Sequence, residues 1–157
     1  MVMQYANHGN LRQFLNGEFN SLNWYNKFKI LCQIAHGLGN IHKEGLIHQD
    51  FHSGNILSHD NFKGFDDFKY FISDLGLSKS ANEKSEKNKK NVYEVLPYVA
   101  PKVLRGKIYT QESDVYNNFG TITYEIFTGL SPYYDMLHEE FLVIKICHQV
   151  LDLKSLN

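Results

Sequence analysis

The sequence predicts a mainly α-helical fold of the α+β kind, a helical bundle with short β-hairpins. Two long segments, at about 23–42 and 113–127, carry apolar residues at helical spacing. Two short apolar segments, Ile56-Leu57 and Tyr70-Phe71-Ile72, are separated by polar residues, and a hairpin fits this arrangement. With 157 residues the chain fits one domain that buries a sizeable core.

Composition narrows the class of protein. The net charge of −1 gives no electrostatic case for binding nucleic acid or an acidic membrane surface. No apolar run approaches the roughly 20 residues that span a bilayer, and the first residues do not resemble a signal peptide. Cys32 and Cys147 lack paired spacing and are predicted to be buried thiols in a reducing compartment. We therefore expect a soluble, cytoplasmic protein.

The chain is expected to begin with the end of a strand, at residues 2–6. Asn10 then caps a short helix over 11–15, in which Leu11, Phe14 and Leu15 share one face. Residues 17–20 are predicted to form a loop.

The clearest helix runs from about 23 to 42, with Asn23 as its N-cap and Gly45 closing its end. Gly37 and Gly39 weaken a helix, so each predicts a closely packed neighbour. The apolar residues expected to form its buried face are Trp24, Phe28, Leu31, Ile34, Ala35, Leu38 and Ile41.

The second half begins with a polar run, residues 79–91, that is predicted to be a solvated mobile loop. A short helix begins near Val103 and ends at Gly106. A second strong helix opens at Ser113-Asp114 and stops at Gly129, and a last one is expected over 139–147.

Candidate functional residues gather in one stretch, residues 47–57. His48 lies two residues before Asp50, and Asn55 follows five residues after Asp50. Asp74 comes after the next apolar segment. A carboxylate near a hydroxyl nucleophile, with an asparagine and a second aspartate near Mg²⁺, is what a phosphoryl-transfer site needs. A lone Asp-x-x-x-x-Asn is more often a polar turn. The prediction of a phosphoryl-transfer site therefore depends on the other motifs of the chain and on their order.

Four motifs follow in order: His48-Gln49-Asp50 with Asn55, Asp74-Leu75-Gly76, Ala100-Pro101-Lys102, and Ser113-Asp114-Val115-Tyr116. Together they resemble the C-terminal lobe of a eukaryotic protein kinase domain, of the tyrosine-kinase-like or serine/threonine type. The resemblance covers residues 1–147, and 148–157 form a tail without clear signal.

The resemblance implies a role for each matching residue. Asp50 is the catalytic base, Asn55 binds Mg²⁺ and braces Asp50, and Asp74 bridges Mg²⁺ to the phosphates of ATP. His48 packs under the Asp-x-Gly turn. Asp114 is a buried aspartate that receives backbone N–H groups of the catalytic loop.

The resemblance also implies a nucleotide site and a substrate. Leu57 packs beneath the adenine ring, Met3 is the gatekeeper, and the backbone of Gln4 and Ala6 faces adenine. The cofactors are ATP and Mg²⁺, and the substrate is a protein Ser, Thr or Tyr hydroxyl. The phosphate loop and strand lysine of a kinase do not precede Met3, so we expect a truncated member without its N-terminal lobe, weakly active or inactive alone.

Three residues depart from the family pattern. Gln49 stands where many kinases have an arginine that pairs with a phosphate. His52, a candidate catalytic residue, takes the place of a lysine near the γ-phosphate, and packing or substrate-side polarity is its expected role. Lys102 replaces the glutamate of the Ala-Pro-Glu turn, and that glutamate's arginine partner is also missing, since the only arginines are Arg12 and Arg105.

The segment from Asp114 to Gly120 is one residue longer than in the family. One inserted residue turns everything beyond it by about 100° unless a π-bulge absorbs it. We predict a local bulge near 116–119; a lesion in the sequence is the alternative.

Two other functions stay open. The chain could be a catalytically silent kinase-like module that binds signalling partners through its helical surface. Aminoglycoside and choline phosphotransferases share a His-x-Asp loop, but they lack the Ala-Pro-x turn and the Ser-Asp-Val-Tyr helix, so they fit less well.

Overall fold

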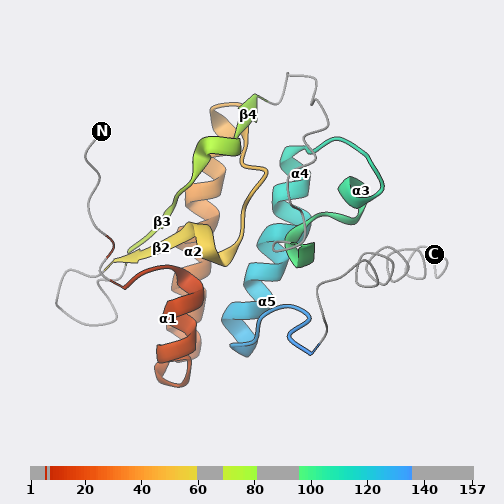
Figure 1. The fold of residues 1–157 in the computed structure, drawn as a ribbon. Helices are drawn as coiled ribbons and strands as arrows, with labels where there is room; N and C mark the ends of the chain where they lie inside the picture. Colours follow the sequence, from red (N-terminus) through yellow and green to blue (C-terminus); the bar gives the residue numbers. More distant parts are fainter. Residues whose placement is uncertain (1–5, 7, 60–68, 81–95, 136–157) are drawn as a thin grey trace.

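The computed structural model describes residues 6, 8–59, 69–80 and 96–135. It is mostly helical, with two antiparallel sheets of two short strands each. The long helix α2 (Trp24–Lys43) packs against strand β3 (Lys69–Ile72) on one side and against helix α5 (Gly120–Thr128) on another (Figure 1). The strand end predicted at 2–6 lies outside the described residues except at Ala6, which is not part of a strand. The predicted helix at 139–147 lies outside them as well.

Helix α1 (Leu11–Glu18) is longer than predicted. Asn10 caps it as expected, in a capping box in which its side chain accepts from the Gln13 N–H and the Gln13 side chain accepts from the Asn10 N–H. The loop predicted for 17–20 is wrong, because the helix continues to Glu18 and a 3₁₀ turn, Phe19–Ser21, follows it.

Helix α2 has the caps that its sequence predicts. The Asn23 side chain accepts from the Asn26 N–H, and Gly45 takes a left-handed backbone with φ 71° after the last turn. The buried face of the helix consists of Lys27, Ile30, Leu31, Ile34 and Leu38.

Some α2 side chains expected inside lie outside. Trp24 and Phe28 are exposed, because they lie beside the buried face of α2 and not on it. Their rings contact Phe127 of α5 with centroids 5.3 and 5.7 Å apart. Ala35 is exposed as well. Cys32 is an exposed free thiol and not the buried one that was predicted, because it lies off the buried face of α2; Cys147 lies outside the described residues.

The two helix glycines behave differently. A Cβ on Gly37 would lie 3.2 Å from Ile72 Cδ1, so strand β3 approaches the helix closely there, as predicted. At Gly39 the prediction is wrong, because a Cβ there would meet no described atom within 4 Å.

The predicted hairpin is present. Strand β2 (Ile56–His59) pairs antiparallel with β3, and Ile56 lies opposite Ile72. The other sheet joins β1 (Leu46–Ile47) to β4 (Lys79–Ser80). The loop predicted over 79–91 is therefore wrong at its first two residues, and 81–91 lie outside the described part.

The second half of the chain contains the predicted bulge. A 3₁₀ turn (Leu96–Tyr98) and helix α3 (Pro101–Leu104) lead to α4 (Gln111–Ser113). A π-helical turn, Asp114–Phe119, then joins α4 to α5, and the prediction of an irregular segment near 116–119 is confirmed. Gly129, with φ 74°, ends α5.

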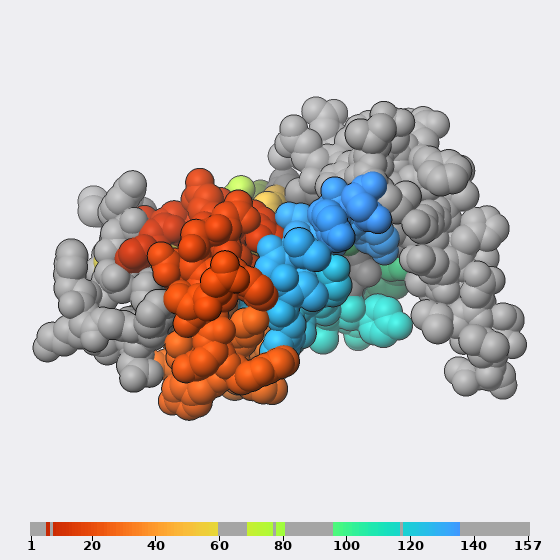
Figure 2. Space-filling view, turned by 90° about the horizontal axis from the view of Figure 1, so that it is seen from below, coloured from red at the N-terminus to blue at the C-terminus, as the bar shows by residue number. Residues whose placement is uncertain are grey.

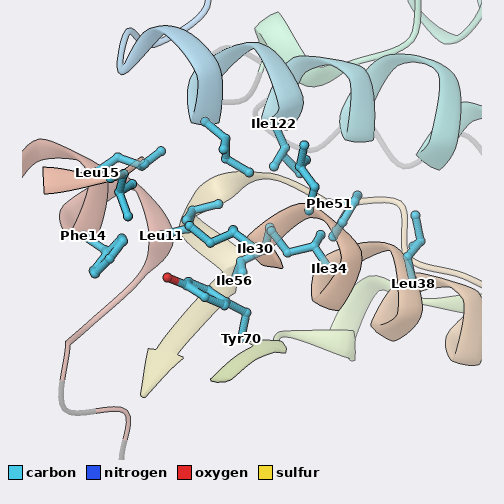
Figure 3. Packing of buried hydrophobic residues seen from close by; sticks show 13 residues of the cluster. Leu11, Phe14, Leu15, Ile30, Ile34, Leu38, Phe51, Ile56, Tyr70 and Ile122 are labelled. Atoms are coloured by element: carbon cyan, nitrogen blue, oxygen red, sulfur yellow. The ribbon is translucent and has the colours of Figure 1, made fainter. Parts of the chain in front are cut away.

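One hydrophobic core joins these elements (Figure 3). Side chains from α1, α2, the hairpin and α5 point toward one another, and Phe51 of the loop that precedes β2 is fully buried in the same cluster. The space-filling view shows α1 and the start of α2 lying against the end of α5 (Figure 2). Among the described residues, no helix combines the length and the apolar character needed to cross a bilayer.

Candidate active site

The loop between β1 and β2, residues 48–55, carries the expected base. Asn55 Nδ2 donates to the backbone oxygen of Asp50 at 2.9 Å and to its Oδ2 at 3.1 Å. The other carboxylate oxygen, Oδ1, lies 3.6 Å from His52 Nε2. The contact with His52 and the hydrogen bond from Asn55 lower the pKa of Asp50 against the opposing effect of partial burial. Asp50 is therefore an ionised, oriented carboxylate at neutral pH.

The ring of His52 is held in one tautomer. The N–H of Gly54 donates to His52 Nδ1 at 3.1 Å, so in the neutral ring the proton resides on Nε2, which faces Asp50. A Cβ at position 54 would lie 2.8 Å from two ring atoms of His52. Glycine at this position is therefore what lets the ring lie over the backbone. Sequence reasoning gave Gly54 no role.

A buried aspartate anchors the loop. Asp114 is fully buried at the start of the π-helical turn, and its carboxylate accepts from the N–H groups of His48 at 2.8 Å and Gln49 at 3.2 Å. His42 Nε2 lies 3.0 Å from the same carboxylate. These donors offset the cost of burying the charge, and the predicted contact between Asp114 and the loop backbone is confirmed. Gln49 has a left-handed backbone, with φ 68°, where the chain turns into the loop.

His48 links the loop to the strand that precedes Asp74. Its Nε2 donates to the Ser73 carbonyl at 3.0 Å, while its Nδ1 accepts from the Asp50 N–H at 3.3 Å. Burial lowers the pKa of His48, in agreement with the neutral ring that these two contacts require. The expected packing beside the Asp-x-Gly turn is present, and the ring also lies against Phe51.

The hairpin brings Asn55 and Asp74 to the same end. Ile56 pairs with Ile72, and the Ser73 N–H and hydroxyl both donate to the Asn55 carbonyl, at 2.8 and 3.0 Å. Asp74 follows at once, with a left-handed backbone of φ 57° and an exposed side chain. Because Nδ2 of Asn55 donates to Asp50, the atom that Asn55 can present to a cation is Oδ1.

On the expected adenine side, Leu57 is half-buried in β2. The chain before α1 runs beside it, because His8 N–H donates to Ser58 O and Ser58 N–H donates to Gly9 O. The Ala6 carbonyl accepts from the Gly9 N–H at 3.3 Å. Met3 and Gln4 lie outside the described residues.

Sequence reasoning missed a buried polar network beside the loop. Glu125 of α5 is fully buried; it accepts from the Tyr98 hydroxyl and lies 3.2 Å from Arg12. Ser53 Oγ lies 3.0 Å from the same Tyr98 hydroxyl, so the network reaches the loop. Burial raises the pKa of Glu125. The signal available in the sequence was that Glu125 is the one charged residue of α5.

Lys102, the residue that departs from the Ala-Pro-Glu turn, has a local partner. Its Nζ donates to Thr110 Oγ1 at 2.6 Å. Arg12, one of the two arginines of the chain, pairs with Glu125, and its guanidinium also donates to Gly129 O at 2.6 Å. Both cations are therefore held within the fold.

Comparison with known proteins points to one family. The family model described as protein tyrosine and serine/threonine kinase matches residues 1–152. The chain is 33% identical over 147 residues to the dual specificity protein kinase splA of Dictyostelium discoideum, covering 87% of this chain and 6% of that protein.

Two relatives from Arabidopsis thaliana are similarly distant. A probable LRR receptor-like serine/threonine-protein kinase is 34% identical over 146 residues, covering 89% of this chain and 15% of the relative. The serine/threonine/tyrosine-protein kinase HT1 is 30% identical over 138 residues, covering 87% of this chain and 33% of HT1. The chain thus spans a third or less of the length of these three relatives.

Proposed function

This chain belongs to the protein tyrosine and serine/threonine kinase family, and from that premise we propose that it transfers the γ-phosphate of ATP to a serine or threonine hydroxyl of a protein. The family is one of ATP-dependent phosphotransferases that act on proteins. The observation that carries the proposal is the Asp50 carboxylate, ionised and held at both oxygens.

In the proposed reaction the substrate hydroxyl donates its hydrogen bond to Asp50. An ionised carboxylate orients that hydroxyl and takes up its proton as the oxygen attacks. Asn55 and His52 keep the carboxylate in one orientation, so the Asp50 side chain does not have to change rotamer before the reaction. His52 is thus proposed to act by holding Asp50.

Asn55 Oδ1 and the Asp74 carboxylate are the proposed Mg²⁺ ligands. In the described part of the chain, no group of three His, Cys, Asp or Glu side chains is arranged to hold a metal. Mg²⁺ at nucleotide sites is bound through one or two protein oxygens, with phosphates and water completing its shell, and the two oxygens here fit that requirement. When bound, Mg²⁺ neutralises charge on the phosphates.

The adenine ring of ATP is proposed to lie over Leu57, between β2 and the segment that contains Ala6. The support is the set of backbone hydrogen bonds that runs this segment alongside β2. Met3 as gatekeeper and the backbone of Gln4 complete the proposed set. The proposal of serine or threonine follows the LRR receptor-like relative, which is a probable serine/threonine-protein kinase. Tyrosine is the alternative, because splA is a dual specificity kinase and HT1 a serine/threonine/tyrosine kinase.

Transfer of radiolabelled phosphate from ATP to a general protein substrate tests the proposal. We expect slow transfer by the wild-type chain, because Gln49, His52 and Lys102 depart from the active pattern. The Asp50→Asn variant keeps the shape of the side chain and loses the base, so its rate is expected to fall by about 10²- to 10⁴-fold. Asp135→Asn, an exposed aspartate outside the loop, is the matched control and is expected to transfer at the wild-type rate.

Phosphate transfer that persists at the wild-type rate in Asp50→Asn would contradict the assignment of Asp50 as the base. A folded wild-type chain that transfers nothing in the presence of ATP and Mg²⁺ would instead favour the second candidate, a silent binding module. The exposed aromatic residues Trp24, Tyr25 and Phe28 are the observation that supports such a module.

A further inference from the structure

The π-helical turn brings a second side chain to the catalytic loop. Asn118 lies in this turn and is 2% exposed. Its Nδ2 donates to the backbone oxygen of Phe51 at 2.8 Å, inside the protein. Phe51 follows Asp50 directly and is fully buried, so this hydrogen bond holds the loop one residue from the proposed base.

The contact determines which way the amide of Asn118 points. A carbonyl oxygen accepts and never donates, so Nδ2 must face Phe51. The other end of the amide, Oδ1, is then buried without a hydrogen-bond partner among the described residues. A buried acceptor without a partner destabilises a fold. Stability alone therefore does not explain why an asparagine occupies this position.

The extra residue of the helix explains how Asn118 reaches the loop. Asp114, Asn118, Ile122 and Ile126 follow one another at steps of four, and all four are buried. In a regular α-helix each step of four turns the side chain about 40° further round the axis. A π-helical turn is wider and removes part of this drift. Asp114 and Asn118 contact the loop, and the two isoleucines that follow belong to the hydrophobic core.

We propose that Asn118 is a positioning residue for Asp50, and that the inserted residue in the central helix is retained because it places Asn118 under the loop. Asp114 accepts from the N–H groups of His48 and Gln49, before Asp50, and Asn118 donates to the carbonyl after it. One helix thus holds the backbone on both sides of Asp50. The proposal rests on the proposed function in that it takes Asp50 as the base.

Asn118→Leu tests it, because leucine has a similar shape and no donor. Amide hydrogen exchange in residues 48–55 is expected to become about three- to tenfold faster. The reason is that the variant lacks one hydrogen bond that opposes local opening of the loop. The melting temperature is expected to stay within about 4 °C of wild type, because the loss of the donor and the removal of the unpartnered Oδ1 oppose each other.

Thr123→Val is the matched control on the same helix. The Thr123 hydroxyl donates to Phe119 O at 2.8 Å, so valine also removes one hydrogen bond without touching the loop, and exchange in 48–55 is expected to stay unchanged. Asn118→Ala serves as a second variant that cannot overpack the site, and it is expected to speed exchange in 48–55 to a similar extent.

Exchange in 48–55 that stays within twofold of the control in both Asn118 variants overturns the proposal, as does faster exchange spread evenly over the whole chain. The measurement needs neither ATP nor a substrate, so a wild-type chain that transfers no phosphate counts against the proposed function alone. Where the wild-type chain does transfer phosphate, Asn118→Leu is expected to lower kcat and leave KM for ATP unchanged. A change confined to KM would contradict the positioning role.

Discussion

Gly54 is the residue on which the orientation of His52 depends. Its N–H holds Nδ1 of the ring, and its missing Cβ leaves the space that the ring occupies. In Gly54→Ala the new methyl group would lie 2.8 Å from the ring, so we expect His52 to leave this position. The ¹⁵N chemical shifts of the imidazole should then change from those of a ring protonated only at Nε2 to those of a tautomer mixture.

Gly39→Ala is the matched control for that experiment. A Cβ at Gly39 meets no described atom within 4 Å, and an alanine in the middle of α2 should stabilise the helix by about 0.5–1 kcal/mol. The imidazole shifts of His52 should be those of wild type. Unchanged shifts in Gly54→Ala would contradict the role given to Gly54.

The lowered pKa of Asp50 predicts a dependence of stability on pH. An unfolded aspartate titrates near pH 3.9, and contact with His52 and Asn55 lowers the folded pKa below that value. The folded state then holds fewer protons, so the stabilisation is fully present above about pH 4 and is lost as pH falls through the folded pKa. Urea unfolding of wild type and Asp50→Asn between pH 7 and pH 3 measures this difference.

In that comparison the stability of wild type should fall toward that of the asparagine variant as the solution is acidified. The control is Asp135→Asn, whose exposed side chain should leave the pH dependence of wild type unaltered. A constant difference between wild type and Asp50→Asn across the whole range would contradict the assigned pKa shift.

At the scale of elements, Glu125 ties three segments together. It joins Arg12 of α1 and Tyr98 of the 3₁₀ turn to helix α5, in a site where the carboxylate is fully buried. Glu125→Ala removes the only carboxylate that contacts the Tyr98 hydroxyl and the Arg12 guanidinium in the described part of the chain. The guanidinium keeps its hydrogen bond to Gly129 O but loses its counter-charge, so we expect a loss of about 3 kcal/mol in the free energy of unfolding. Denaturant unfolding gives this number directly.

Two further variants sharpen that test. Glu125→Gln keeps a carbonyl oxygen that can accept from Tyr98 and should lose less stability than the alanine variant. Glu44→Ala, at an exposed position just after α2, should change the free energy of unfolding by no more than about 0.5 kcal/mol. Equal losses for Glu125→Ala and Glu44→Ala would show that the network contributes nothing to stability.

The ends of the helices could be predicted from capping residues in the sequence. Asn10, Asn23 and Gly129 each cap a helix as their residue types predict, because a cap depends on atoms within a few residues. The pairing of Leu46–Ile47 with Lys79–Ser80 was not predicted. Strands of two residues have no periodicity to read, and these two form only because the hairpin between them brings them together.

At the scale of the whole molecule, the loop that carries Asp50 is held by residues distant in sequence. Asp114 accepts from His48 and Gln49 across more than 60 positions, and Asn118 donates to Phe51 in the same way. Such contacts connect the π-helical turn to the loop between β1 and β2. The arrangement of the candidate site is therefore a property of the packed core.

The sequence by itself determined the mainly helical class, the hairpin, the family, and the identity of the residues in the loop. It also predicted the irregular turn near 116–119, because a one-residue excess in a helix has few solutions. These are properties of spacing along the chain, and spacing can be read without coordinates.

Only the tertiary structure decided which faces are buried and which polar groups meet. Cys32 is exposed, no described atom lies within 4 Å of a Cβ at Gly39, and Asn118 donates to Phe51. Nothing in the sequence next to these three residues indicates any of this. Burial depends on what packs against a face, and a hydrogen bond between distant residues depends on the path of the whole chain. The loop could be recognised from its residues, and the helix that holds it in place could be found only in the fold.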